Sequence, residues 1–346
     1  MRIIQAIDAS GWGGAENVVV SLSNGLSRRG HEVEVWVRRN SLLCDELEKS
    51  VVVREVPFLN DGDPMTVFLF AKALRSYDVL HVHLGKASIL SGFANAFLRK
   101  RFSNKLFCHM HSFHKPKHYR NQKQIICVSK AVEDYVKENM PWVQKTWVVH
   151  NGIDLLKAQS AEPLVPRNAD RVRVGLLASF KKGKGHEDLI KAVALLLKSD
   201  LPVELVLGGE GPLFPDMVAL ASELKISDRV NFMGFVPPEK VFGFWKSVDV
   251  ACFPSYVEGF SMSVVEAMAS GVPVVAYNYQ GATEALGEGA VFVPVGDMTT
   301  LARSLKMIIE DHKLRKDLAA ISLQKSKGYS VEAMVDGILE VYRSTH

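Results

Sequence analysis

Residues 258–271 read Glu-Gly-Phe-Ser-Met-Ser-Val-Val-Glu-Ala-Met-Ala-Ser-Gly, and their two carboxylates, Glu258 and Glu266, stand eight positions apart. An apolar run precedes the stretch, and the apolar residues after Ser263 recur at helical spacing. These patterns predict a strand, a loop and a helix in that order. Ser261 or Ser263 would cap the helix, whose first N–H groups and dipole would then face the loop.

Such a helix start suits a phosphate group, so the stretch predicts a phosphate site. Eight residues make about two helical turns, which would place the two acids on nearly the same face. Glu258 would then meet a sugar on one side of the phosphates and Glu266 a ribose on the other. The alternative is one loop acid and one surface acid without a ligand, and spacing alone does not separate the two.

The stretch from Glu258 to Ala276 resembles the signature of the retaining glycosyltransferases of family 4, which have the GT-B fold. The resemblance implies an α/β protein with two Rossmann-like domains, whose parallel sheets face a central cleft. It also implies that Glu258 binds hydroxyls of a donor sugar and that Glu266 binds the ribose diol of a nucleotide-sugar.

Near the N-terminus, residues 2–37 predict a strand, a helix and a second strand, with a glycine-rich loop at 8–16. This is a βαβ unit, although the loop lacks the G-x-G-x-x-G spacing of dinucleotide-binding proteins. Gly13 and Gly14 would let backbone N–H groups approach a phosphate or sugar, or they merely form a tight turn. The resemblance favours the first role, because the family carries a Gly-Gly pair here.

Four histidines, His81, His83, His109 and His111, lie near the ends of two predicted strands, and their alternation predicts that each pair shares a strand face. Ligands bind at strand ends in open α/β sheets. No acidic or cysteine ligand stands beside them at zinc spacing, so we expect no metal. The resemblance assigns His111 to the donor sugar, whereas we expect His109 to point to the other face and to be structural.

Residues 155–170 lose periodicity and gather prolines and polar residues, which indicates a linker between two domains. We expect a first, acceptor-side domain at 1–165 and a second, nucleotide-sugar-binding domain at 170–328. On the resemblance, a C-terminal helix at about 331–346 returns to the first domain.

The loop at 181–185 places three lysines beside two glycines, and a lysine is a compact charge that suits a diphosphate. Solvated loop lysines are the alternative. The family carries an arginine about five residues before a Lys-Gly pair, and Lys184-Gly185 matches the pair. The arginine position falls on Ala178 or Ser179, so the arginine is missing unless a neighbouring lysine substitutes for it.

The resemblance also predicts donor contacts at strand ends and at the start of the helix, from Ser179, Gly209, Phe235, Phe260, Ser261, Met262 and Ser263. The backbone near Phe235 would meet the base.

The chain has 346 residues, 47% of them hydrophobic, which is enough for two domains. Its net charge of +4 is uneven, because residues 1–160 hold 22 lysines and arginines against 15 acidic residues. Basic clusters at 99–105 and 115–123 suit an anionic membrane surface or an anionic acceptor, and an ordinary solvated face is the alternative.

No run approaches the ~20 apolar residues of a spanning helix, and the N-terminus is typical of a strand rather than a signal peptide. The four cysteines are scattered, as buried reduced thiols would be. We therefore expect a cytoplasmic protein, with peripheral contact at the inner face of the membrane.

The resemblance implies a metal-independent hexosyltransferase or other glycosyltransferase of the retaining type, with His111, Lys184 and Glu258 as catalytic residues. Its donor would be a nucleotide-diphosphate sugar, it would have no bound cofactor, and its acceptor would be a glycan or lipid-linked precursor in cell-envelope polysaccharide or lipopolysaccharide synthesis. No protein nucleophile is assigned, because the leaving phosphate oxygen is thought to act as the base in retaining members.

Two alternatives remain open. A non-catalytic nucleotide- or glycan-binding protein of the same fold is suggested by the missing arginine. A nucleotide-sugar epimerase would need acid and base carboxylates that the sequence does not place. Nucleic acid is not an expected partner, because the basic clusters lack interleaved aromatic residues.

Overall fold

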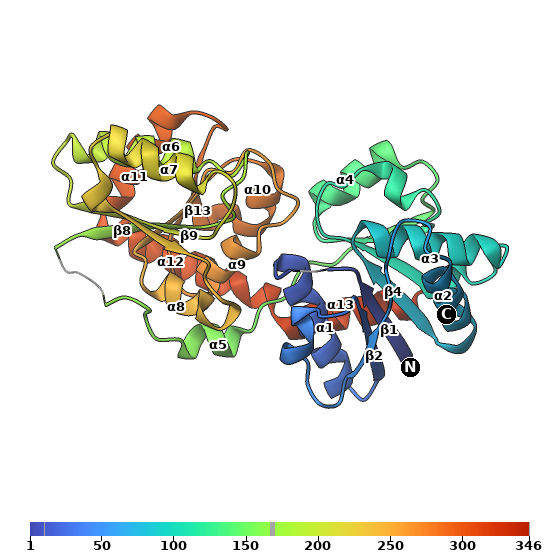
Figure 1. Ribbon diagram of the computed structural model, residues 1–346. Helices are drawn as coiled ribbons and strands as arrows, with labels where there is room; N and C mark the ends of the chain where they lie inside the picture. The colour runs from blue at the N-terminus through green and yellow to red at the C-terminus, as the bar shows by residue number, and fades with distance from the viewer. Residues whose placement is uncertain (10, 167–169, 346) are drawn as a thin grey trace. The chain divides into compact units, whose positions relative to one another are not determined.

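The computed structural model describes residues 1–9, 11–166 and 170–345. Ser10 in the predicted glycine-rich loop, residues 167–169 of the predicted linker and His346 of the predicted C-terminal helix lie outside the described residues. The chain divides into two compact units, Met1–Ile153 with Tyr329–His346, and Asp154–Gly328. Each unit contains one sheet with helices around it (Figure 1).

The first unit is built on a seven-stranded parallel sheet in the order β3-β2-β1-β4-β5-β6-β7. Its strands are β1 (Arg2–Ile7), β2 (Glu32–Val37), β3 (Val52–Glu55), β4 (Val79–His83), β5 (Leu106–Met110), β6 (Gln124–Cys127) and β7 (Lys145–Val148). Its helices are α1 (Gly14–Arg28), η1 (Leu42–Glu46), α2 (Pro64–Ser76), α3 (Gly85–Phe97), η2 (Ser103–Lys105), η3 (Pro116–Tyr119), α4 (Lys130–Asn139), η7 (Lys327–Tyr329, which begins in the second unit) and α13 (Val331–Arg343).

The second unit has a six-stranded parallel sheet in the order β10-β9-β8-β11-β12-β13. Its strands are β8 (Val172–Leu177), β9 (Val203–Gly208), β10 (Val230–Gly234), β11 (Val250–Phe253), β12 (Val274–Tyr277) and β13 (Ala290–Val293). Its helices are α5 (Leu155–Ser160), α6 (His186–Leu197), α7 (Phe214–Glu223), η4 (Ser227–Arg229), η5 (Pro238–Lys240), α8 (Val241–Lys246), α9 (Met262–Ala269), α10 (Gln280–Leu286), η6 (Gly287–Gly289), α11 (Met298–Glu310) and α12 (His312–Ser326).

Both sheets are doubly wound, and each strand order contains a switch point, the place where the direction of strand addition reverses. The central strands β4, β5, β6, β11 and β12 are buried along their whole length, as parallel strands covered on both faces are. The chain runs outward from β1 and from β8, and then returns to place β4 beside β1 and β11 beside β8. Open sheets of this kind bind ligands at the carboxyl ends of the two strands that flank the switch.

The C-terminal helix α13 is part of the first unit. It packs against α1, where a Cβ on Gly25 would lie 2.5 Å from a methyl group of Val335, so only glycine allows this approach. The chain leaves and re-enters the unit at one place, because Ile153 N–H donates to Tyr329 O at 2.8 Å and Val331 N–H donates to Ile153 O at 3.1 Å.

The segment predicted as a linker, residues 155–170, begins instead with the helix α5. The carboxylate of Asp154 caps this helix by accepting the Lys157 N–H at 3.0 Å. Six residues are too few to display a helical period, which explains why the sequence pattern missed it. The second unit starts at Asp154, so α5 is counted with it, although the sequence placed the first domain's end at 165.

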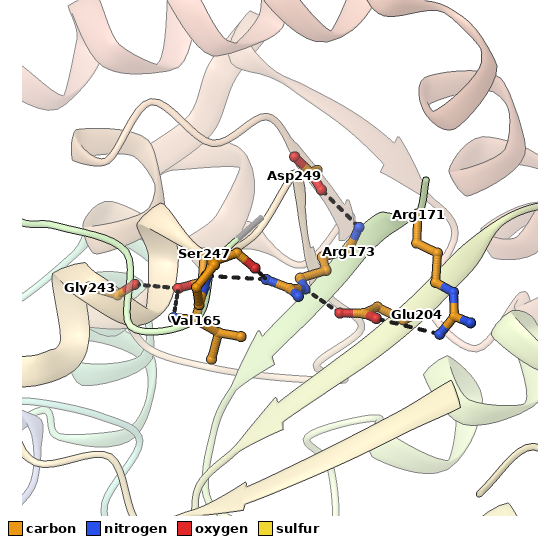
Figure 2. Close-up of polar contacts among 8 residues, drawn as sticks. Val165, Arg171, Arg173, Glu204, Gly243, Ser247 and Asp249 are labelled. Atoms are coloured by element: carbon orange, nitrogen blue, oxygen red, sulfur yellow. Dashed lines mark hydrogen bonds and ion pairs between the residues drawn. The ribbon is translucent and has the colours of Figure 1, made fainter. Parts of the chain in front are cut away.

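The remaining described part of that segment is fixed to the second unit by Arg173 (Figure 2). This buried guanidinium pairs with Glu204 and also donates to Val165 O at 3.2 Å. Val165 N–H donates to Ser247 Oγ at 2.9 Å, and the Arg173 backbone N–H donates to Asp249 Oδ2 at 2.9 Å. Arg173 thus ties the incoming chain to the amino end of β8.

Among the described residues, no helix has both the length and the apolar composition that crossing a bilayer requires. The four cysteines are all unpaired thiols.

We predict that Arg173→Ala destabilises the second unit by about 3 kcal/mol, because it leaves the Glu204 carboxylate and the Val165 carbonyl without their buried partner. Native-state hydrogen exchange of the β8 and β9 amides measures this unit separately. Arg171→Ala is the control, since Arg171 reaches Glu204 only at 4.0 Å and is more exposed. Equal effects of the two substitutions would contradict the anchoring role of Arg173.

Candidate functional site

Two loops meet at the switch point of the second sheet. The loop at 178–185 follows β8 and contains Lys184, and the loop at 254–261 follows β11 and contains Glu258. The backbone ties them together, because Tyr256 N–H donates to a carbonyl of the first loop, Gly183 O, at 2.8 Å. Lys184 and Glu258, to which the sequence analysis gave different roles, therefore lie in loops that follow the neighbouring strands β8 and β11.

Two glycines with positive φ allow these loops to pack so closely. Gly185 has φ +74°, and a Cβ there would lie 2.0 Å from Pro254 O. Gly209, which follows β9, has φ +126°, and a Cβ there would lie 2.1 Å from Ala178 O. No other residue type could keep both the backbone conformation and the contact. The carboxyl ends of β8, β9 and β11 are therefore held backbone to backbone.

Lys184 and Glu258 form an ion pair, with Nζ 2.9 Å from Oε1. Ser255 Oγ donates to the same carboxylate oxygen at 2.6 Å. The carboxylate is mostly buried, so these two partners hold it with charge-assisted bonds in a shielded place. The sequence interpretation did not include Ser255, which stands three residues before Glu258 in the same loop.

Glu266 lies inside α9 and is only 7% exposed. Burial raises the pKa of its carboxyl to about 7, and the indole N–H of Trp245 opposes this rise in part. The helix begins at Met262, so Glu258 lies in the loop before it, and the expectation that the two acids share a helix face was wrong. The Gly259 turn and the helix start at 262 end the helical period between them.

Ser261 occupies the N-cap position of α9, but its side chain makes no capping hydrogen bond. Ser263 lies inside the first turn instead of capping it. The first N–H groups of α9 therefore have no side-chain acceptor at the cap, and they are available to an anion at this edge of the sheet.

The other predicted donor contacts also lie after strands of the second sheet. Ser179 follows β8, and Phe235 follows β10 with half of its surface exposed. Phe260 is buried next to the N-cap of α9. A Cβ on Gly281 would lie 2.8 Å from Glu258 O, so the start of α10 packs directly against the backbone of the loop that carries Glu258.

In the first unit, the glycine-rich loop follows β1 at its own switch point. Gly13 is the N-cap of α1 and Gly14 is its first residue. Two acids that the sequence interpretation did not assign lie here: Asp8, which pairs with Lys86 at 3.7 Å, and the buried Glu16. Desolvation raises the pKa of both carboxyls. Their position after a central strand is the signal that could have identified them.

The four histidines form a stack on one face of the first sheet. His109 and His111 have ring centroids 4.4 Å apart, and His81 and His109 lie 5.3 Å apart and nearly parallel. The prediction that His109 points to the other face was wrong, because residues two apart on a strand share a face. Burial lowers the pKa of His111 to about 3 and that of the other three well below the usual value.

Three of these side chains, His81, His83 and His109, are the ones that could gather around a metal ion. Each of the three offers a ring nitrogen that lies within 4.8 Å of the other two. His83 also uses both ring nitrogens in hydrogen bonds. Binding a metal through His83 would therefore cost it at least one of these two hydrogen bonds.

Comparison with known proteins matches both units. The family described as Glycosyltransferase Family 4 matches residues 12–156, and the family described as Glycosyl transferases group 1 matches residues 164–324. The chain is 28% identical to the lipopolysaccharide core biosynthesis glycosyltransferase LpsE of Rhizobium meliloti (strain 1021), over 96% of both chains. It is 27% identical to the D-inositol 3-phosphate glycosyltransferase of Nocardia farcinica (strain IFM 10152), over 95% of this chain and 84% of that one.

Among solved structures, Anabaena Alr3699/HepE in complex with UDP and glucose is similar with a TM-score of 0.83 and 22% identity, covering 99% of this chain and 100% of that one. The predicted pair of Rossmann-like domains of the GT-B type is therefore confirmed.

We predict that the Glu266→Gln variant gains stability relative to the wild type as the pH rises. The folded carboxyl keeps its proton up to about pH 7, whereas the unfolded one loses it from 4.5. The free energy of unfolding of the wild type therefore falls by about 3 kcal/mol across this window. The glutamine variant has no ionising group at this position, so its free energy of unfolding lacks this fall. Urea unfolding between about pH 5 and about pH 8 measures the difference.

The exposed Glu223 of α7 gives the control, Glu223→Gln. A difference between Glu266→Gln and the wild type that stays constant with pH would show that Glu266 ionises normally.

Proposed function

The chain belongs to the glycosyltransferases of family 4, and we propose that it is a retaining, metal-independent enzyme that uses a nucleotide-sugar donor. The observation that carries the proposal is the Lys184–Glu258 pair at the switch point of the second sheet, one loop away from the buried Glu266. A cation, a helix start and two acids are the groups that a diphosphate between two sugars requires.

Lys184 would bind the diphosphate and stabilise the charge that develops on the leaving group. In the free protein this ammonium is bound to one carboxylate. A diphosphate carries more negative charge than a single carboxylate, so it competes for Lys184 when it binds. The oxygen of Glu258 that Lys184 releases can then accept sugar hydroxyls, while Ser255 continues to orient the carboxylate.

Glu266 would bind the ribose. Within the described part of the chain, no lysine or arginine pairs with its carboxylate. A ribose diol offers two hydroxyl donors, which would satisfy a buried carboxylate that otherwise keeps its proton to about pH 7. Donor binding would therefore favour the ionised form of Glu266.

The acceptor would be a glycan or a lipid-linked precursor of the cell envelope. The relative from Rhizobium meliloti is named for lipopolysaccharide core biosynthesis, which supports an envelope role. A non-catalytic nucleotide-binding protein is the second candidate, and the observation in its favour is the uncharged pair Ala178-Ser179 at the position of the family's arginine.

The first unit also offers a surface for an anionic membrane. On α3, Phe93 is 44% exposed and Phe97 is 76% exposed. The basic residues 99–101 follow directly, and the exposed Lys115 and Lys117 lie at the start of η3, which packs on α3. Aromatic rings beside lysines and arginines suit the headgroup region of an anionic bilayer. We propose that the protein associates peripherally through this α3 surface.

We predict that Glu258→Gln lowers sugar transfer by about a hundredfold and leaves nucleotide affinity within about twofold. The amide no longer carries the charge that strengthens hydroxyl contacts near the reacting carbon. Release of nucleoside diphosphate from radiolabelled nucleotide-sugars measures transfer and hydrolysis, and calorimetry with nucleoside diphosphates measures binding.

Glu239→Gln, in the exposed η5 segment, is the matched control. Undiminished turnover in Glu258→Gln would remove Glu258 from the mechanism. Wild-type protein that binds nucleotide-sugars without ever turning them over would establish the non-catalytic alternative.

We predict that the double variant Phe93→Ser, Phe97→Ser binds anionic vesicles about tenfold more weakly, since each ring contributes apolar area at the interface. Sedimentation with vesicles that contain an anionic phospholipid measures this, and neutral vesicles test the role of the basic residues. Leu195→Ser, at an exposed apolar position of α6, is the control. Equal binding of all three proteins would exclude the α3 surface.

A further inference from the structure

Four buried side chains form one hydrogen-bonded chain behind His111, running from the sheet to the C-terminal helix: His83, Gln5, Tyr342 and His81. We propose that this chain fixes the tautomer of His111 and leaves its Nδ1 as a bare hydrogen-bond acceptor for a ligand hydroxyl. The proposal rests on the proposed function only in identifying that hydroxyl as one of the donor sugar.

The chain is continuous and its bonds have ordinary lengths. His111 Nε2 lies 2.9 Å from His83 Nδ1, and His83 Nε2 lies 2.7 Å from Gln5 Oε1. The amide of Gln5 donates through Nε2 to the Tyr342 hydroxyl at 3.1 Å, and that hydroxyl lies 2.7 Å from His81 Nδ1. All five residues lie within the first unit.

The amide of Gln5 decides the direction of the bonds on the side of His111. Its Oε1 can only accept, so His83 must carry its proton on Nε2. A neutral imidazole then has no proton on Nδ1, so His83 Nδ1 accepts from the Nε2–H of His111. His111 is thereby the Nε2–H tautomer, and its Nδ1 carries a lone pair.

The other side of the chain follows the same direction. The Tyr342 hydroxyl accepts from Gln5, so it gives its own proton to His81 Nδ1. All three histidines in the chain are therefore Nε2–H tautomers. Reversing the Gln5 amide would reverse every bond and convert all three to Nδ1–H tautomers together. Burial keeps the imidazoles neutral, which this logic requires.

The end of the chain points to a ligand. Within the described chain, His111 Nδ1 is shielded from solvent and has no hydrogen-bond partner. His111 directly follows β5, so it lies at the carboxyl end of a central strand, where a ligand binds in such sheets. A bare acceptor at this position selects a hydroxyl and disfavours a phosphate or carbonyl oxygen, which could not donate to it.

The test reads the tautomers directly, in full-length protein labelled with ¹⁵N at histidine and without any donor. Long-range ¹H–¹⁵N correlation spectra separate protonated from bare ring nitrogens, and the single variants His81→Asn, His83→Asn and His111→Asn assign the signals. We expect His81, His83 and His111 to be Nε2–H tautomers. Finding His111 with its proton on Nδ1, or finding different tautomers among the three, overturns the proposal.

The variant Tyr342→Phe tests whether the chain sets the tautomer. Without the hydroxyl, the Gln5 amide loses its acceptor and can take both orientations, so we expect His111 to become a mixture of two tautomers. Tyr119→Phe is the matched control, because the Tyr119 hydroxyl is equally buried in the same unit and has no hydrogen-bond partner among the described residues. An unchanged His111 signal in Tyr342→Phe overturns the role of the chain.

Activity supplies a separate readout. If half of the Tyr342→Phe molecules hold the competent tautomer, sugar transfer falls about twofold relative to Tyr119→Phe. The predicted tautomers in a wild-type protein that transfers no sugar would defeat the proposed function and leave the hydrogen-bond chain intact. The reverse result, transfer with other tautomers, would defeat the chain alone.

Discussion

The candidate site of the second unit is built around one ion pair: the ammonium of Lys184 and the carboxylate of Glu258 lie 2.9 Å apart at the carboxyl edge of the sheet. The pair forms only because loops from β8 and β11 touch, and they touch because glycine stands where a Cβ would meet a carbonyl. Both charges are thus in place before any ligand arrives. Under the proposed function, a diphosphate would find Lys184 already at this edge of the sheet and would displace only its bond to Glu258.

The strands and helices that surround the site could be predicted from the sequence, because alternating or continuous apolar runs mark the strands and the helical period marks the helices. The order of the elements then implies the switch points. Two features could not be predicted for physical reasons. Helix α5 is too short to show a period, and the distance between Lys184 and Glu258 depends on loop conformations that residue types alone do not determine.

The histidine stack shows the same limit at the level of single atoms. The period of a strand predicts that His109 and His111 share a face, as their stacked rings do, and only the separate orientation given to His109 was wrong. His83, in contrast, bonds to Gln5 of β1, and Gln5 in turn bonds to Tyr342 of α13, which stands 337 positions after it. Only the packing of α13 on the sheet reveals that a tyrosine hydroxyl completes this network.

The chain passes between the two units twice, next to Ile153 and next to Tyr329, and the closeness of these two places has an evolutionary consequence. Both ends of the second unit emerge from the first unit at neighbouring, hydrogen-bonded positions, so the whole segment Asp154–Gly328 is topologically an insert within a host fold. A module with adjacent ends can be exchanged without rethreading its host. Recombination at these two junctions would exchange the module that carries Lys184 and Glu258 among related chains, while each host kept its own sheet and terminal helix. Such exchange would combine the ligand specificity of one chain's second unit with that of another chain's first unit.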